Sequence, residues 1–164
     1  MKKTFFLFPV LLGLFLANCF SIMRIEGNSM KDKFNDGQFI LILKNIFVFD
    51  YKQGDIATVK VLNKGNKKIT FVKEIIGCPG DIVTKYFSSE NCSRIIVTNS
   101  SQIMHYYPKE TLRGCENITL HSKVSTKLNN HYYLLGNNYL HSTDSRNFGS
   151  VTKNQLQGKV IFSF

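Results

Sequence analysis

The chain has 164 residues, and its 21 Lys and Arg outnumber 11 Asp and Glu, which gives a formal net charge of +10. This length favours a single domain and is too short for an eight-stranded α/β barrel, which needs about 250 residues. With 43% hydrophobic and 20% charged residues, the chain can bury a core and is not a disordered polycation. Its basic excess indicates an anionic partner, either nucleic acid or lipid.

The chain begins with Lys2 and Lys3 and then carries no charge from Phe5 to Met23. A helix over this stretch would be about 28 Å long, close to the ~30 Å hydrocarbon core of a bilayer. We therefore expect residues 1–24 to form one uncleaved transmembrane anchor. The alternatives are a cleaved secretory signal with a weak site at residues 17–19, and a lipoprotein modified at Cys19.

The rest of the chain is predicted to be mainly β. Apolar runs and period-two alternation predict strands, and the cluster Asn63–Asn66 predicts a turn between two of them. A short helix is expected only around Thr152–Leu156. Residues 86–130 are polar and are interpreted as an insertion, roughly 87–130, or long loops over a β core. The expected strands cover residues 38–43, 55–61, 68–76, 80–84, 94–98, 131–135 and 159–164.

The remaining charge is scattered. Without residues 1–24 the chain keeps 18 Lys and Arg against 11 Asp and Glu. No zinc-finger spacing or nucleic-acid motif accompanies these charges. We therefore expect a basic surface beside anionic lipid and no nucleic-acid partner.

The four cysteines lack the spacing of a metal site, and we expect no metal and no cofactor. Cys92 and Cys115 could form a disulfide if the domain lies outside the cytosol. Cys78 stands in a Gly-Cys-Pro-Gly turn, where it is interpreted as a small buried residue.

Three segments carry candidate chemistry. Residues 26–30 (Glu-Gly-Asn-Ser-Met) place a serine in a glycine-containing turn, which by itself would be an ordinary loop. Residues 71–81 place Lys73 within an apolar strand that ends in a Gly-Cys-Pro-Gly-Asp turn, and such a lysine would ordinarily face solvent. Residues 135–149 form a polar loop that an Asp144–Arg146 contact could close.

Together and in this order, these segments resemble the type I signal peptidase family of membrane serine peptidases. The resemblance covers the apolar segment and residues 24–86 and 131–164. It implies an antiparallel, barrel-like β domain over residues 25–164 and a Ser/Lys dyad. It also implies removal of signal peptides from secretory precursors by a single-pass protein of the bacterial cytoplasmic membrane, with its catalytic domain on the extracytoplasmic side. We expect this protein to be a monomer.

By this resemblance, Ser29 is the nucleophile, Lys73 is the general base and Ser142 orients the lysine. The oxyanion hole would use the backbone N–H of Ser29. Many family members add a hydroxyl side chain two residues before the nucleophile, where this chain has Gly27.

The resemblance also assigns supporting roles. Asp144 and Arg146 match a structural salt bridge, and Gly136 and Gly149 match glycines that shape the backbone of the site. Substrate would bind extended beside residues 70–73 by strand addition. Its small Ala-x-Ala side chains would enter shallow pockets lined by residues that include Met30, Phe71 and Val72.

Elementary chemistry supports such a dyad. A serine hydroxyl is a poor nucleophile until a base removes its proton. Lysine can act as that base only when neutral, so its pKa must fall from about 10.4 to about 8, which corresponds to roughly 3 kcal/mol. The apolar neighbours of Lys73 could supply this desolvation, and a neutral partner such as Ser142 would not restore the charge.

Three features depart from the family pattern. After Ser29-Met30 the family usually has Pro and a small residue, whereas this chain continues with residues 31–33 (Lys-Asp-Lys). Glu74 stands where a basic residue is common, and Asn137 replaces the usual aspartate. These departures leave room for a specialised relative that matures a conjugative pilin or a narrow set of substrates.

Other hypotheses remain open at the level of sequence. A Ser-His-Asp triad could combine Ser29 and Asp144 with His141 or His131. A self-cleaving repressor-type Ser/Lys protein is disfavoured because an apolar segment stands where a DNA-binding motif would be. An inactive, membrane-anchored β adaptor is disfavoured because both dyad residues are present.

Overall fold

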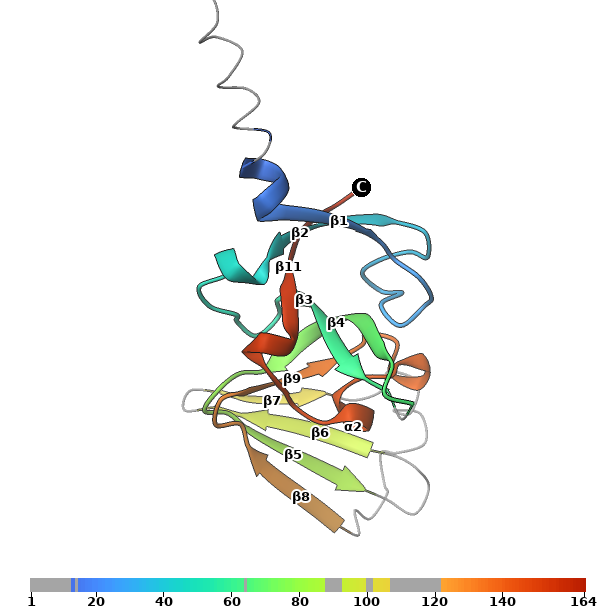
Figure 1. Cartoon of the computed structure of the whole chain (residues 1–164). Helices are drawn as coiled ribbons and strands as arrows, with labels where there is room; N and C mark the ends of the chain where they lie inside the picture. Colours follow the sequence, from blue (N-terminus) through green and yellow to red (C-terminus); the bar gives the residue numbers. More distant parts are fainter. Residues whose placement is uncertain (1–12, 14, 64, 88–92, 100–101, 107–121) are drawn as a thin grey trace, which may run out of the picture.

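The computed structural model describes residues 13, 15–63, 65–87, 93–99, 102–106 and 122–164. Their strands form two antiparallel sheets, so the mainly β prediction is confirmed (Figure 1). In spatial order, the seven-stranded sheet contains β1 (Phe20–Arg24), β2 (Phe39–Lys44), β11 (Leu156–Ser163), β3 (Ile56–Leu62), β4 (Lys68–Gly77), β9 (His131–Leu135) and β10 (Val151–Thr152). The four-stranded sheet contains β7 (Ile103–Tyr106), β6 (Ser93–Thr98), β5 (Ile82–Phe87) and β8 (Ser122–Lys127).

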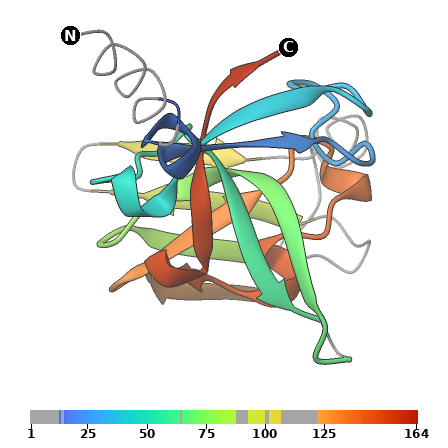
Figure 2. The ribbon, with the colours of Figure 1, turned by 45° about the horizontal axis from the view of Figure 1, so that its top comes forward.

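The β3–β4 hairpin forms the centre of the large sheet, and Figure 2 shows its strands side by side. Along β3 the side chains of Ala57, Val59 and Val61 are buried, and Lys60 is exposed. This alternation follows from the two-residue repeat of a strand, which turns successive side chains to opposite faces. Within the predicted turn, Asn66 adopts the left-handed backbone conformation with a φ of 59°, which asparagine tolerates well.

Strand β4 has two neighbours over only part of its length. Its residues from Lys68 to Glu74 pair with β3, whereas β9 pairs only with Glu74, Ile75 and Gly77. Among the described residues, the β9-side edge of β4 therefore lacks a strand partner from Lys68 to Lys73. An edge of this kind presents backbone hydrogen-bonding groups to another chain.

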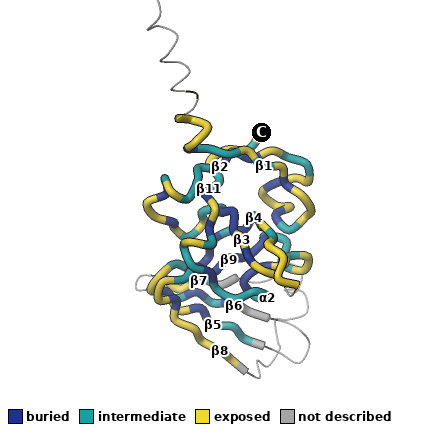
Figure 3. Tube along the Cα trace, viewed as in Figure 1, coloured by how far each residue is buried: buried dark blue, intermediate teal, exposed yellow. Residues whose placement is uncertain are grey.

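The smaller sheet packs on the larger one through a second apolar core, in which Ile76 and Leu135 meet Val83, Ile95 and Val97. Buried residues concentrate in β3, β4 and β9, whereas β8 is exposed from Lys123 to Lys127 (Figure 3). The expectation of long loops over residues 86–130 is therefore wrong for the described part of this region, which contains β6, β7 and β8. The interpretation of residues 87–130 as an insertion stays a prediction. The predicted strand at residues 94–98 is present within β6.

The N-terminal apolar run does not continue as a helix to Met23. Residues 15–19 are helical, but β1 begins at Phe20 and pairs with β2 along its whole length. Within the described part of the chain, no helix has both the length and the apolar character needed to cross a membrane. Residues 1–12 and 14, which make up most of the expected anchor, lie outside the described residues, as do Cys92 and Cys115.

The expected helix at residues 152–156 is a single 3-10 turn, η3 (Lys153–Gln155), between β10 and β11. Two further 3-10 turns are η1 (Asn45–Phe47) and η2 (Tyr139–His141), and the described α-helix of the loop after β9 is α2 (Ser145–Phe148). Cys78 is half-buried beside the core of the large sheet, in partial agreement with its predicted role.

Candidate active site

Ser29 lies in a compact turn between β1 and β2. The carbonyl of Met30 accepts hydrogen bonds from the backbone N–H groups of Lys33 and Phe34, both at 2.8 Å. Met30 is 1% exposed and packs in an apolar cluster with Ile25 and Phe34. This cluster fixes the turn to the large sheet, so the serine is held by buried side chains on both sides of it.

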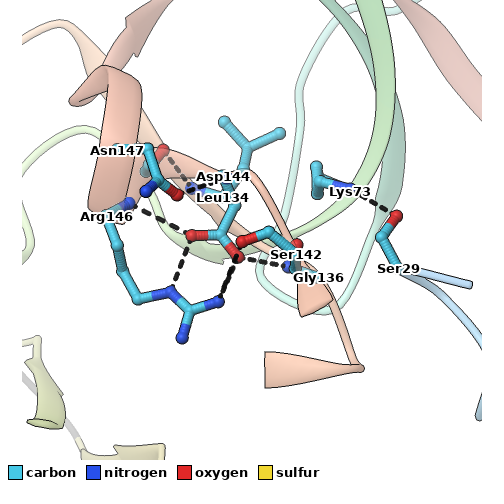
Figure 4. A network of polar contacts seen from close by, with 9 residues as sticks. Ser29, Lys73, Leu134, Gly136, Ser142, Asp144, Arg146 and Asn147 are labelled. Carbon is cyan, nitrogen blue, oxygen red and sulfur yellow. Dashed lines mark hydrogen bonds and ion pairs between the residues drawn. The ribbon is translucent and has the colours of Figure 1, made fainter. Parts of the chain in front are cut away.

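The turn brings Ser29 to Lys73, which lies 44 positions later on β4. Lys73 Nζ donates a hydrogen bond to Ser29 Oγ at 2.6 Å, as Figure 4 shows. Lys73 is 1% exposed. The Phe71 ring, two residues earlier on the same face of the strand, has its centroid 5.4 Å from Lys73 Nζ.

Burial lowers the pKa of Lys73 from 10.5 to about 8. The negative charge of Asp144 opposes this shift by raising the pKa, and the positive charge of Arg146 lowers it. The desolvation expected from the apolar neighbours of the lysine therefore dominates its titration. A substantial fraction of Lys73 is neutral near pH 8, as a general base requires.

The loop after β9 carries the Asp144–Arg146 salt bridge, drawn in Figure 4. Asp144 is fully buried, and its two carboxylate oxygens accept from Arg146 Nε and Nη2, each at 2.8 Å. The Gly136 N–H also donates to Asp144 Oδ2, at 3.0 Å. Burial lowers the pKa of Arg146, but the hydrogen bond and charge of Asp144 outweigh this effect and raise it.

The two glycines of this loop serve different purposes. A Cβ at Gly136 would lie 2.1 Å from Ser142 Oγ and 2.7 Å from the Ser29 carbonyl oxygen, so only glycine fits between these segments. Gly149 ends α2 with a φ of 83°, a conformation that other residues rarely adopt. Gly136 thus allows close approach, and Gly149 allows the turn that ends the loop.

Ser142 lies against Gly136 at the lysine side of the loop. Its hydroxyl oxygen is buried and has no hydrogen-bond partner among the described residues. The recorded hydrogen bond of Lys73 Nζ goes to Ser29 Oγ. The orienting role of Ser142 therefore stays a prediction.

A cleft of about 260 Å³ opens beside Ser29 and Lys73. The predicted pocket residues Met30, Phe71 and Val72 all line it together with Ser29 and Lys73. The opposite wall comes from the end of β1 and the residues after it. The lining from that side consists of Met23, Arg24, Ile25 and Glu26.

Asn138 was not identified from the sequence as a site residue. Its backbone N–H donates to the Ser29 carbonyl at 3.0 Å, and its Nδ2 donates to the Asn28 carbonyl at 3.1 Å. These two bonds attach the serine turn to the loop after β9. The sequence signal for this role is that Asn138 stands two residues after Gly136 and keeps the asparagine of the family's Gly-Asp-Asn pattern.

The geometry does not favour the Ser-His-Asp alternative. Both carboxylate oxygens of Asp144 are bound to Arg146. His141 is exposed, and no hydrogen bond links it or His131 to Ser29 in the described structure.

Comparison with known proteins identifies the family. The family model for signal peptidase, peptidase S26, matches residues 1–164. A signal peptidase I of Bacillus licheniformis is 27% identical, over 99% of this chain and 86% of its own length. Signal peptidase I P of Bacillus subtilis subsp. natto is 30% identical, over 94% and 82%.

A crystal structure of a signal peptidase I from Enterococcus faecalis V583 has a TM-score of 0.42 and 19% identity, covering 70% of this chain and 99% of that one. The family model covers the whole chain. The resemblance noted from the sequence motifs is confirmed, and the chain belongs to the signal peptidase family, peptidase S26, and is a hydrolase of peptide bonds.

Proposed function

We propose that this protein is a membrane-bound serine endopeptidase that removes N-terminal signal peptides from secretory precursors, with Ser29 and Lys73 as its dyad. The observation that carries the proposal is the 2.6 Å hydrogen bond between Ser29 Oγ and a buried Lys73. Family membership across the whole chain supports the same conclusion.

In the proposed reaction, neutral Lys73 takes the proton of Ser29 Oγ as the oxygen attacks the scissile carbonyl carbon. The backbone N–H of Ser29 stabilises the resulting oxyanion. Lys73 then returns the proton to the leaving amine, and an acyl group remains on Ser29. Water, deprotonated by Lys73, hydrolyses this ester and regenerates the free serine. No metal or cofactor takes part in this scheme.

The substrate would bind as an additional strand along the open edge of β4, where backbone groups of residues 70–73 can pair with it. The cleft there is small, and Met30, Phe71 and Val72 leave room for short side chains. This arrangement supports cleavage after small residues of the Ala-x-Ala type.

We further propose that residues 1–24 include the anchor and that the sheet lies at an extracytoplasmic membrane surface as a monomer. Exposed aromatic side chains gather beside the C-terminal end of β1, where Phe39 pairs with Arg24. Phe39 and Phe164 stack at 6.0 Å, and Phe162 and Phe164 stack at 6.2 Å. These side chains are 44–62% exposed. Apolar surface of this kind suits contact with lipid.

The test is reconstitution of the full-length protein in detergent with a secretory precursor, followed by N-terminal sequencing of the product. We expect one cut after a small residue and no cut with Ser29→Ala. Cleavage that persists in the Ser29→Ala variant would refute the proposal.

A panel of unrelated precursors then distinguishes a general peptidase from the narrow specialist that the departures at Glu74 and Asn137 leave open. A serine-directed acylating probe tests the inactive-adaptor alternative, because an adaptor would leave Ser29 unlabelled in the folded protein.

A further inference from the structure

The residue after the proposed base connects three parts of the site. Glu74 lies next to Lys73 on β4, and its side chain leaves the opposite face of the strand. Its Oε2 atom accepts from Lys33 Nζ at 3.1 Å and from Asn137 Nδ2 at 3.0 Å. The Glu74 side chain is 20% exposed and that of Lys33 is 38% exposed. The cluster thus lies partly exposed at the surface.

Each partner of Glu74 belongs to a segment that holds Ser29. The Lys33 N–H closes the serine turn on the Met30 carbonyl at 2.8 Å. Asn137 immediately precedes Asn138, whose N–H holds the Ser29 carbonyl at 3.0 Å. One carboxylate therefore joins the turn of the nucleophile, the strand of the base and the loop that packs on both.

The same carboxylate stands at the point where β4 gains its second neighbour. Glu74 pairs with Ile56 on β3 and with Leu135 on β9, and the open edge begins one residue earlier. Beyond this point no strand ladder ties the serine turn to β4 within the described residues. The side-chain bonds of Glu74 join the turn to β4 in addition to the packing of Val72 on the Met30 cluster and the Lys73–Ser29 hydrogen bond.

Building on the proposed function, we propose that Glu74 is a positioning residue, which acts through Lys33 and Asn137 to hold the Ser29 turn within hydrogen-bond distance of Lys73. Its ion pair with Lys33 and its hydrogen bond from Asn137 do not involve Ser29 or the ammonium of Lys73. Misplacement of a reacting group by about 1 Å can lower a rate by about 100-fold. Partly exposed ion pairs add little to global stability, so the effect should appear in the rate of acylation.

The cluster permits a rescue experiment. Asn137 Oδ1 is buried and has no partner among the described residues. In the double variant Lys33→Glu/Glu74→Lys, the new ammonium at position 74 can bind both the new carboxylate at position 33 and the amide oxygen of Asn137. This exchange preserves the connection between segments and reverses every charge in it.

The test measures the acylation rate of Ser29 by a serine-directed acylating probe, and kcat and KM for a precursor peptide, in full-length protein in detergent. We expect Glu74→Ala and Lys33→Ala each to lower the acylation rate and kcat by about 10- to 100-fold. KM should change less than twofold, and the exchanged double variant should recover to within about threefold of the wild type.

A matched control is Lys159→Ala, which removes an ion pair of 2.7 Å between Lys159 and Asp55, away from the serine turn. We expect it to react at the wild-type rate. Wild-type acylation rates in both single variants, or no recovery in the double variant, would overturn the positioning role of Glu74 and leave the proposed function standing. Failure of the wild-type protein to be labelled at Ser29 would instead overturn the proposed function.

Discussion

The protein buries two polar pairs next to each other, and they are built in opposite ways. Asp144 and Arg146 form a two-pronged ion pair, with further hydrogen bonds from the backbone N–H groups of Gly136 and Arg146. Lys73 is equally buried, yet its recorded side-chain hydrogen bond goes to the neutral hydroxyl of Ser29. The Asp144–Arg146 pair keeps both charges because they neutralise each other, whereas the burial of Lys73 favours its neutral form.

This contrast explains the choice of residue types. Arginine cannot be deprotonated in proteins, so Arg146 remains a suitable permanent partner for a buried carboxylate. Lysine changes its pKa readily when buried. A carboxylate bound directly to Lys73 would keep it protonated and prevent it from accepting a proton from Ser29.

The largest expected effect comes from replacing Lys73, the buried lysine that bonds a neutral hydroxyl. Lys73→Met should lower cleavage by about 10⁴-fold or more. Ser29 and Lys73 are proposed to act as a unit, and removing one member of such a unit costs about as much as removing the whole unit. The matched control is Lys85→Met, since burial also lowers the pKa of Lys85, which lies over the Tyr133 ring at 5.2 Å. Single-turnover kinetics should show less than a tenfold loss for the control. Comparable losses of cleavage in Lys73→Met and Lys85→Met would contradict a special role for Lys73.

Breaking the compensated pair should mainly affect folding. Asp144→Asn leaves the Arg146 charge unpaired in a partly buried site, and we expect the free energy of unfolding to fall by about 3–5 kcal/mol. Denaturant titration measures this loss. Asp81→Asn is the control, since Asp81 is also buried but accepts a hydrogen bond from the Cys78 backbone and forms no ion pair with a described residue. An equal loss in both variants would argue against the ion pair as the cause.

The uncompensated lysine should also lower stability at neutral pH. Its pKa of about 8 in the folded state lies below the ordinary 10.5, so the unfolded chain binds more protons between these values. Wild-type stability should therefore rise with pH across the window from about 8 to 10.5, by about 3 kcal/mol from this group. Lys73→Met should be the more stable protein at pH 7 and lose that advantage as the pH rises. A difference in the free energy of unfolding between the wild type and Lys73→Met that stays constant with pH would contradict this expectation.

The rate of cleavage should follow the neutral fraction of the lysine. Below a midpoint of about pH 8, kcat/KM should fall about tenfold for each pH unit, which gives roughly 100-fold at pH 6. Asp144 raises this pKa, so the midpoint in Asp144→Asn should move to lower pH. A midpoint that moves to higher pH in Asp144→Asn would show that the fall in kcat/KM below about pH 8 does not report the protonation of Lys73.

The smallest expected effect is at Ser142. Its buried hydroxyl has no partner among the described residues, so Ser142→Ala should not lower the melting temperature. We expect cleavage to fall by about tenfold if this hydroxyl orients Lys73 during the reaction, which a kinetic assay beside a thermal melt can measure. Unchanged cleavage would remove Ser142 from the mechanism.

The sequence predicted the parts of the fold in which local pattern and tertiary packing agree. The β3–β4 hairpin combines alternating side chains with a turn cluster at Asn63–Asn66. Residues 20–24 were assigned to a helix because they continue an apolar run, and only their pairing with β2 makes them a strand. Helix α2 has four residues and depends on capping by Asp144, so it is too short for periodicity to reveal.

The proposed Ser29–Lys73 dyad was predicted from motifs, whereas the contacts that support it were not. Glu74 and Asn137 were each noted as departures from the family pattern, and their contact with each other and with Lys33 became visible only in three dimensions. The strands β7 and β8 were missed because they are short or rich in Ser, Thr and Lys, and their pairing with β6 and β5 supplies the order that their composition does not predict.

The junction at Phe20 has a mechanical consequence. The helical residues 15–19 pass into β1 with no intervening loop, and all five residues of β1 pair with β2 (Figure 1). The strand ends at Arg24, five residues before Ser29. Because this junction has no loop, an orientation imposed on the N-terminal segment is passed through β1 to the cleft that the end of this strand lines. Under the proposed function, the pairing of β1 with β2 would therefore set the distance between the N-terminal segment and the bond that is cut.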